Sequence, residues 1–337
     1  MKKDIHFVHA VCGPNRPQII LIGNGLELGC KPTQKPKKGP SDQLSWDDLV
    51  IKINVNKSIN PKKTDINSIP LPFPLLYSLL SVPFPAPAKL DKAAVDKEEK
   101  KLKEAMNELA QYSTVHLDKL KTLGADHIMS TNYSYGLEQA FFPGIDFLNS
   151  STRSAHRFNL NPEKTDSGPK REICYRMHSG YYAANQDGSP VGLWHIHGEC
   201  GASKGVVLGH DRYGRLLSRI EKICDNQDYK NLTKDPDNFE FVSWPELFLY
   251  GDVYIVGFGF KECEFDLWWL LKRKQRERYA DGRVYFYEEP DPNSVKQKLL
   301  LAHGVELVDV GAAKGDFDDH YKKAFEDIKR RIASRNP

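Results

Sequence analysis

The feature that most constrains the fold is the regular alternation of short apolar strands and helices in the last third of the chain. The expected strands are 253–256, 283–287 and 305–310, and the expected helices are 265–279, 294–303 and 317–332. Parallel strands need crossover connections of this kind, whereas antiparallel strands are joined by short turns. The pattern therefore predicts an α/β fold with a parallel sheet that is covered by helices on both faces.

Three earlier segments have the same apolar, β-branched character, at 18–22, 125–130 and 191–196. Together with the last third they predict a Rossmann-like sheet of about six parallel strands. A chain of 337 residues is long enough for one such domain with insertions. We therefore expect one domain, 1–337.

Two stretches interrupt the alternation. Residues 31–120 form an expected insertion that is rich in proline and lysine and becomes helical near its end. Within 92–120 the apolar residues recur at helical spacing and include Leu102, Met106, Leu109 and Leu120, which predicts a long amphipathic helix with one buried face. Residues 143–188 are polar and rich in turn-forming residues, so we expect a surface excursion there.

Charge and cysteine content exclude several classes of protein. The 48 Lys and Arg residues nearly balance the 45 Asp and Glu residues, so neither nucleic-acid nor membrane-surface binding is expected. No signal peptide is visible, and the most apolar stretch, 71–87, is broken by five prolines, so no membrane span is expected. The six cysteines are dispersed, without the paired spacing of a zinc ribbon. A reducing cytoplasm is the expected location.

Glycine turns directly follow two of the expected strands. Gly23-Asn24-Gly25 comes after 18–22, and Gly257-Phe258-Gly259 comes after 253–256. In open parallel sheets ligands bind outside the carboxyl ends of the strands, where glycine lets the backbone approach a phosphate and free amides attract it. Neither turn has the full GxGxxG pattern of a dehydrogenase. The pair nevertheless favours a dinucleotide-binding site.

Polar side chains follow two further strands. Asn132 follows 125–130, and its alternative interpretation is a residue that only caps a turn. His195, His197 and Glu199 have strand spacing and can face the same side, which also allows a metal site. No second cluster of potential ligands accompanies them, so we expect no metal.

Five motifs in this order resemble a known family. They are GNG after the first strand, STNYSYGLEQ at 130–139, WHIHGE at 194–199, LGHDRYGRLLSRI at 208–220 and VGFGFKECEFDLWWLL at 256–271. They resemble the bacterial sirtuin-like proteins, a branch of the sirtuin NAD-binding fold whose members act as effectors in anti-phage defence. SWDDLV and PLPFPLLYSLL, within the insertion, also resemble this branch.

The resemblance implies a Rossmann-like fold that binds NAD+ as substrate, with Asn132 and His197 as catalytic residues. Glu138 matches a glutamate that commonly follows the TNY motif. The residues that match nucleotide-binding turns are Gly23, Asn24, Gly25, Gly257, Phe258 and Gly259. Two positions depart from the family pattern: Asn24 stands where alanine is usual, and Ser134 stands where aspartate is usual.

The implied activity is hydrolysis of the nicotinamide–ribose bond, which yields nicotinamide and ADP-ribose and depletes NAD+ in abortive infection. Such an activity must be regulated, so the resemblance also implies a sensor subunit or a homo-oligomer, with the contact expected in residues 31–120. One alternative is an NAD-dependent protein deacylase, which the missing zinc ribbon disfavours. The other is a non-catalytic subunit that senses a nucleotide, which the Ser134 departure leaves open.

Overall fold

The structure is a computed structural model. It describes residues 16–28, 46–56, 59, 68–83, 88–89, 91–109, 116–161, 175–226, 239–279 and 281–334. In the described part of the chain the strands form one eight-stranded sheet, in the order β3-β4-β5-β2-β1-β6-β7-β8.

Six neighbouring strands are parallel, as the sequence predicts. They are β1 (Gln18–Ile22), β2 (His127–Ser130), β5 (Pro190–His195), β6 (Asp252–Val256), β7 (Val284–Tyr287) and β8 (Val305–Val308). The fold class is therefore α/β and Rossmann-like.

Two antiparallel strands extend the sheet beyond β5, where the sequence analysis expects only a surface excursion. They are β3 (Arg157–Asn159) and β4 (Ser179–Ala184). The expectation for this part of 143–188 is wrong because β3 has only three residues and β4 reads SGYYAA, with no β-branched run. Small residues are required here: a Cβ on Gly180 would lie 2.5 Å from the Leu193 carbonyl oxygen.

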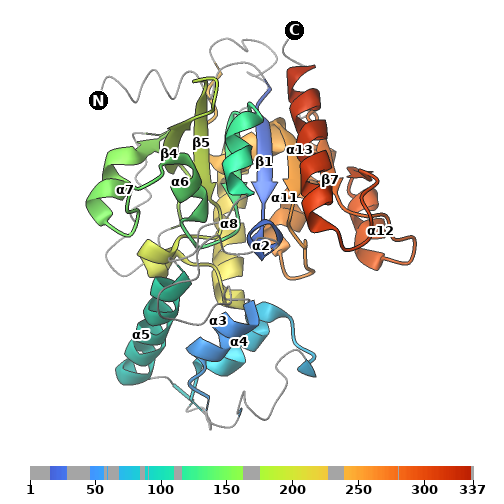
Figure 1. Cartoon of the computed structure of the whole chain (residues 1–337). Coiled ribbons are helices and arrows are strands. Elements are labelled where there is room, and N and C mark those ends of the chain that lie inside the picture. Colours follow the sequence, from blue (N-terminus) through green and yellow to red (C-terminus); the bar gives the residue numbers. More distant parts are fainter. Residues whose placement is uncertain are drawn as a thin grey trace.

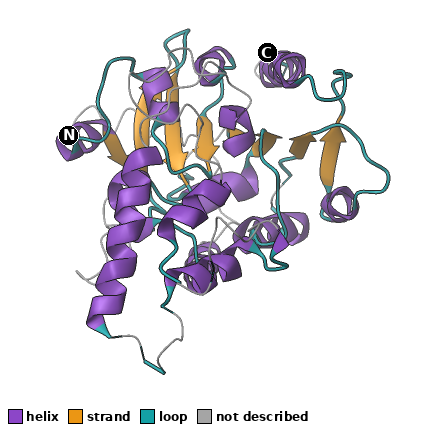
Figure 2. Ribbon diagram, turned by 60° about the horizontal axis from the view of Figure 1, so that its bottom comes forward, coloured by secondary structure: helices purple, strands orange, loops and turns teal. Residues whose placement is uncertain are grey.

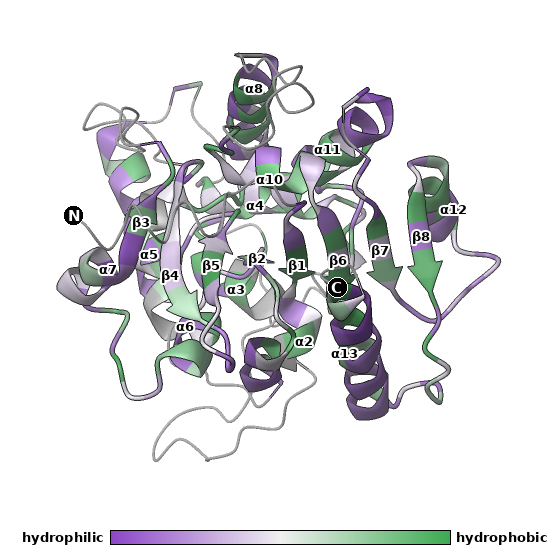
Figure 3. Cartoon of the chain, turned by 90° about the horizontal axis from the view of Figure 1, so that it is seen from above, coloured by the Kyte–Doolittle hydropathy of each residue, from purple (hydrophilic) through white to green (hydrophobic). Residues whose placement is uncertain are grey.

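Helices cover both faces of the sheet (Figures 2 and 3). On one side lie α8 (His210–Asn226), α10 (Trp244–Tyr250), α11 (Phe265–Arg276) and α12 (Val295–Ala302), and on the other lie α2 (Asn24–Leu28), α6 (Gly136–Phe141), the 3-10 helix η2 (Leu117–Thr122) and α13 (Phe317–Ala333). The shorter α7 (Ser150–His156) and η3 (Cys200–Gly205) lie in connections. Alternate residues of β1 enter separate cores: Ile20 and Ile22 join one, and Ile19 and Leu21 join the other.

The insertion contributes a helical module, defined here as α3 (Trp46–Ile53), α4 (Phe73–Ser81) and α5 (Lys92–Leu109). Figure 1 shows it below α2, on the side of the sheet where β1 ends. Helix α4 forms despite its prolines because Pro72 precedes it and Pro74 lies in its first turn, where an amide donor is not needed. Ser78 on α4 hydrogen-bonds to His210 on α8 at 3.0 Å, so the module is attached to the sheet domain.

The long helix predicted for 92–120 is two elements, α5 and η2. Leu102 and Met106 on α5 are buried, and so is Leu120 on η2. Burial of the predicted apolar face is confirmed for these three residues, while the side chain of Leu109 lies outside the described residues. No helix in the described part of the chain combines the length and apolar character needed to cross a bilayer.

Candidate functional site

The glycine turns meet where the direction of strand order reverses. From β1 the chain passes to β2 on one side and later to β6 on the other, so the ends of β1 and β6 form a topological switch point. The Gly25 amide donates to the Gly257 carbonyl oxygen at 2.8 Å. A Cβ on Gly25 would lie 2.8 Å from that oxygen, and a Cβ on Gly23 would lie 2.9 Å from the Phe258 Cα. These glycines are therefore required by contact between the two turns.

This contact corrects one expectation. The sequence analysis takes the amides of the first turn to be free for a phosphate, but the Gly25 amide is bonded to Gly257. Asn24 begins α2. Gly259 differs from the others, because it is exposed and a Cβ there would have no described atom within 4 Å. Of the predicted turn residues, Gly259 has the most freedom to face a ligand.

A pocket of about 250 Å³ opens beside the turns. Gly25, Gly257, Phe258 and Gly259 line one side of it, and residues from the ends of β7 and β8 and from the start of α13 line the other. Gly23 and Asn24 do not line it. The pocket therefore contains four of the six residues predicted to bind the nucleotide.

Asn132 lies at the neighbouring strand end. The residue is 5% exposed, and neither its side-chain nitrogen nor its side-chain oxygen has a hydrogen-bond partner among the described residues. Its own backbone carbonyl accepts a hydrogen bond from His195 at 2.8 Å, which fixes the backbone. A residue that caps a turn would form a hydrogen bond with the backbone through its side chain, and the Asn132 side chain forms none with the described residues. An unpaired buried amide costs about 1–3 kcal/mol, and such costs are typical of functional sites.

His197 follows β5, which pairs with β2 so that Ser130 lies opposite His195. The His197 ring is buried, and its Nε2 lies 2.9 Å from Asp266 Oδ2. Its Nδ1 lies 3.7 Å from Glu264 Oε2, which is too far for a direct hydrogen bond. Burial lowers the pKa of His197, but the charge and hydrogen bond of Asp266 and the charge of Glu264 more than offset this and raise it. Asp266 thus holds the ring with Nε2 toward it and leaves Nδ1 to accept a proton.

Glu264 is the outermost member of this cluster. Its side chain is 12% exposed, and it accepts a hydrogen bond from the Tyr213 hydroxyl at 2.9 Å. Burial and the charge of Asp266 raise the pKa of Glu264, while His197 opposes that rise. The cluster can therefore store a proton on either the imidazole or the Glu264 carboxyl group.

The sequence analysis missed Glu264 and Asp266. The signal available was a pair of carboxylates two residues apart, a few residues after the second glycine turn, with Glu264 at the N-cap of α11 and Asp266 in its first turn. Their partner, His197, is 69 residues away from Asp266 in the chain, so no local pattern connects them.

His195 has a separate partner. Its Nε2 lies 2.9 Å from Glu138 Oε1, and both side chains are buried. Burial lowers the pKa of His195, but the charge and hydrogen bond of Glu138 raise it to about 9. Because His195 also bonds to the Asn132 carbonyl oxygen, this pair holds the backbone that carries Asn132.

Glu199 completes the expected His195, His197 and Glu199 set, but it faces two arginines. Arg157 and Arg176 lie 2.9 Å and 2.6 Å from its carboxylate, and the Tyr181 hydroxyl also donates to it. Burial would raise the pKa of Glu199, but the arginines lower it to about 2. The three residues therefore have three different sets of partners and do not converge on one metal position.

A different set, His197, Glu264 and Asp266, has potential metal-ligand atoms within 4.8 Å of one another. A cation bound through His197 Nε2 would have to displace the hydrogen bond to Asp266. In this structure His197 and Asp266 form a hydrogen-bonded pair, and Glu264 lies beside the other ring nitrogen.

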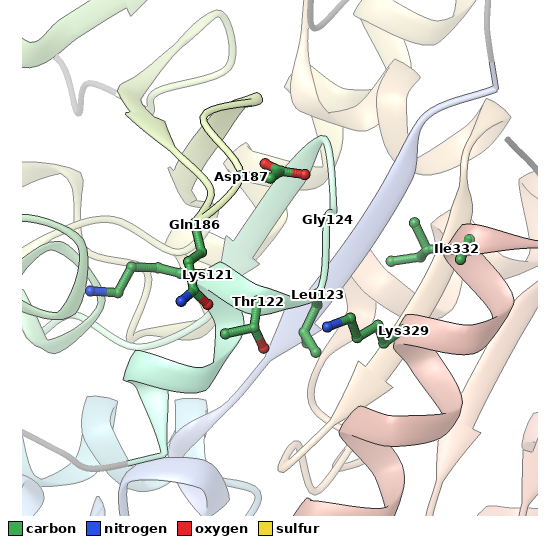
Figure 4. Close-up of a pocket in the computed structure, with 9 residues that line it drawn as sticks. Lys121, Thr122, Leu123, Gly124, Gln186, Asp187, Lys329 and Ile332 are labelled. Atoms are coloured by element: carbon green, nitrogen blue, oxygen red, sulfur yellow. The ribbon is translucent and has the colours of Figure 1, made fainter.

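A larger cleft, of about 430 Å³, lies at the opposite edge of the sheet (Figure 4). Its residues precede β2, form the turn between β4 and β5, and belong to α13, with Lys121, Asp187, Lys329 and Ile332 among them. None of the predicted site residues lines it. It is therefore not part of the candidate active site.

Comparison with models of known protein families and with curated proteins finds no match for this chain. The resemblance to sirtuin-like proteins accordingly stays a prediction.

Proposed function

We propose that this protein is an NAD+ hydrolase that cleaves the nicotinamide–ribose bond. The observation that carries the proposal is the buried carboxamide of Asn132, which has no hydrogen-bond partner among the described residues. Asn132 follows β2, and His197, which is hydrogen-bonded to Asp266, follows the neighbouring strand β5. Both lie at the edge of the sheet where the glycine turns and their pocket are found. The order of the motifs, which resembles sirtuin-like proteins, favours NAD+ as the ligand.

The chemistry needs little from the protein at the leaving group. Nicotinamide departs as a neutral ring from a cationic one, so no proton donor is needed. The transition state resembles an oxocarbenium ion, as in other glycoside hydrolysis, and rewards groups that orient the ribose and a water molecule. The Asn132 carboxamide offers two donors and an acceptor for this task.

His197 supplies the base in this proposal. With its Nε2 proton held by Asp266, Nδ1 can accept a proton from the attacking water or from a ribose hydroxyl. Base assistance of this kind is typically worth about 10² to 10⁴ in rate. Glu264 lies beside Nδ1 and offers the proton a second position nearer to solvent.

The deacylase alternative has less support. Those enzymes use a zinc ribbon beside the acyl-lysine cleft, whereas the cysteines of the described residues, Cys200, Cys224 and Cys263, are separate, buried and free. A nucleotide-sensing subunit would also use the pocket, but it would have no need for the unpaired amide and the histidine–carboxylate pair together.

Product analysis distinguishes these functions. The purified chain is incubated with NAD+, with and without an acetylated peptide, and the products are separated by chromatography. Free nicotinamide with ADP-ribose supports the proposal, whereas acyl-ADP-ribose with a deacylated peptide establishes the deacylase. Intact NAD+ that binds to the protein under activating conditions contradicts the proposal and supports the sensor.

We further propose that the activity is a regulated one, acting in the cytoplasm in defence against phage. Unregulated loss of NAD+ would kill the cell, so a partner subunit or an oligomer must hold the enzyme inactive. The helical module is the expected contact, because it lies on the same side of the sheet as the end of β1 (Figure 1).

A further inference from the structure

The buried cluster around His197 has the features of a cation site. His197, Glu264 and Asp266 each offer one potential ligand atom, and these three atoms lie within 4.8 Å of one another. Two of the three side chains are carboxylates, and Asp266 Oδ1 is buried without a hydrogen-bond partner among the described residues. Carboxylates that share a buried site repel each other unless a cation lies close to both, so the cluster is suited to hold one.

The position of the cation follows from the partners of the imidazole. His197 Nε2 lies 2.9 Å from Asp266 Oδ2, so this nitrogen donates its proton to the carboxylate and Nδ1 keeps a free lone pair. In metal sites the histidine nitrogen that does not bind the metal commonly donates to a carboxylate, which fixes the ring and strengthens the other nitrogen as a ligand. The His197–Asp266 pair therefore has the arrangement of a histidine that binds a metal through Nδ1.

Glu264 offers the second ligand. Its Oε2 lies 3.7 Å from His197 Nδ1, and two ligand atoms of a tetrahedral zinc ion are about 3.4 Å apart when each bond is about 2.1 Å long. The same oxygen accepts a hydrogen bond from the Tyr213 hydroxyl at 2.9 Å, which holds it in place and leaves a lone pair for the cation. Because the Glu264 side chain is 12% exposed, it gives an ion a path from solvent, and water can complete the coordination.

We infer that His197 Nδ1 and Glu264 Oε2 form an inhibitory site for a late first-row divalent cation such as Zn²⁺. An imidazole with a carboxylate suits zinc and its neighbours, whereas magnesium prefers a shell made of oxygen atoms. The inference rests on the proposed function in taking Nδ1 as the base, because an ion on Nδ1 occupies the lone pair that would accept the proton. The ion is therefore a reversible inhibitor and differs from a resident cofactor, which the sequence analysis does not expect.

The first test measures Zn²⁺ binding to the full chain by calorimetric titration and needs no turnover. The wild type should bind one Zn²⁺ ion more per chain than His197→Ala does. Glu264→Gln, which keeps an oxygen that can accept from Tyr213, should bind that ion at least about tenfold more weakly. His116→Ala is the matched control and should bind Zn²⁺ as the wild type does, because His116 is also buried and lies 2.9 Å from a carboxylate, that of Asp318.

The second test measures nicotinamide release by the wild type in the presence of the ion. Zn²⁺ should stop the release over the concentration range in which it binds, and a chelator added in excess should restore it. Mg²⁺ at the same concentrations should leave the rate unchanged, because the imidazole is a poor ligand for it.

Equal Zn²⁺ binding by the wild type, His197→Ala and Glu264→Gln would overturn the inference, and so would loss of the ion in His116→Ala alone or a rate that rises with Zn²⁺. Nicotinamide release by a chain that binds no Zn²⁺ through His197 would leave the proposed hydrolase standing without this site. A chain that binds the ion through His197 and Glu264 but never releases nicotinamide would instead establish the cation site and contradict the hydrolase.

Discussion

The two ends of the candidate site are built differently. Around Asn132 and His197 the polar side chains are buried and held by hydrogen bonds, as with His197 to Asp266 and His195 to Glu138. The pocket on the other side of the switch point is lined by glycine backbone, partly exposed aromatic rings and surface carboxylates. The buried end is suited to fixing reacting atoms, whereas the open end is suited to recognising a ligand. Substitutions at the buried end should therefore lower the reaction rate, whereas substitutions at the open end should weaken ligand binding.

The largest effect is expected from Asn132→Ala and His197→Ala. Each should lower the rate of nicotinamide release by about 10² or more, because each removes a group that acts on the reacting ribose. Asn132→Ala should leave the melting temperature unchanged or slightly raised, since the lost amide has no hydrogen bond to lose. Product release and thermal unfolding measure the two effects separately.

His303→Ala, at the C-cap of α12 and outside both the pocket lining and the His197 cluster, is the control for these variants and should retain full activity. A strong loss of stability in Asn132→Ala would show that the amide is structural. Undiminished activity in both Asn132→Ala and His197→Ala would remove the catalytic assignment altogether.

Gly25→Val should act on the stability of the fold. The new side chain would meet the Gly257 carbonyl oxygen at 2.8 Å or less and disturb the hydrogen bond between the turns. We expect a loss of about 1–3 kcal/mol in the free energy of unfolding, measured by urea denaturation. Gly259→Ala, where a Cβ has room, should unfold at the same urea concentration as the wild type. Equal stability of all three proteins would refute the contact between the turns.

The pH dependence of the rate should report the position of His197. As a base the imidazole must be neutral, so the rate should rise with pH through a pKa above the 6.5 of a free histidine. Asp266→Asn removes the charge that raises this pKa, so the rising limb should move to lower pH while the plateau falls. Profiles of nicotinamide release against pH test this, and an unmoved limb would exclude Asp266 as the residue that positions His197.

The last prediction concerns the free energy of unfolding at alkaline pH. A histidine whose pKa is raised on folding stabilises the protein fully below its unfolded value, near 6.5, and loses that contribution as pH rises through its folded value, about 9 for His195. The free energy of unfolding should therefore fall by about 1–3 kcal/mol between pH 6.5 and pH 9.5. Glu138→Gln should flatten this decline. A decline of the same slope in that variant would assign it to other groups.

The sequence predicts the open end better than the buried end. The six parallel strands and the two glycine turns follow from local periodicity and composition, because buried parallel strands are continuous apolar runs. The pairing of His195 with Glu138 and of His197 with Asp266 joins residues 57 and 69 positions apart, and only the folded sheet brings them together. The strands β3 and β4 were missed because their contribution depends on neighbours, with Gly180 packed against β5, and not on their own propensity.

The contact between the glycine turns also limits how this molecule can diverge. Each turn limits the size of the residues in the other. A Cβ at position 25 would lie 2.8 Å from the Gly257 carbonyl oxygen, and a Cβ at position 257 would lie 2.7 Å from the Leu26 amide nitrogen. Neither turn can therefore enlarge alone, and any relative with a bulkier residue in one must have rearranged the other. We therefore expect positions 25 and 257 to change together in evolution, although 231 residues of sequence lie between them.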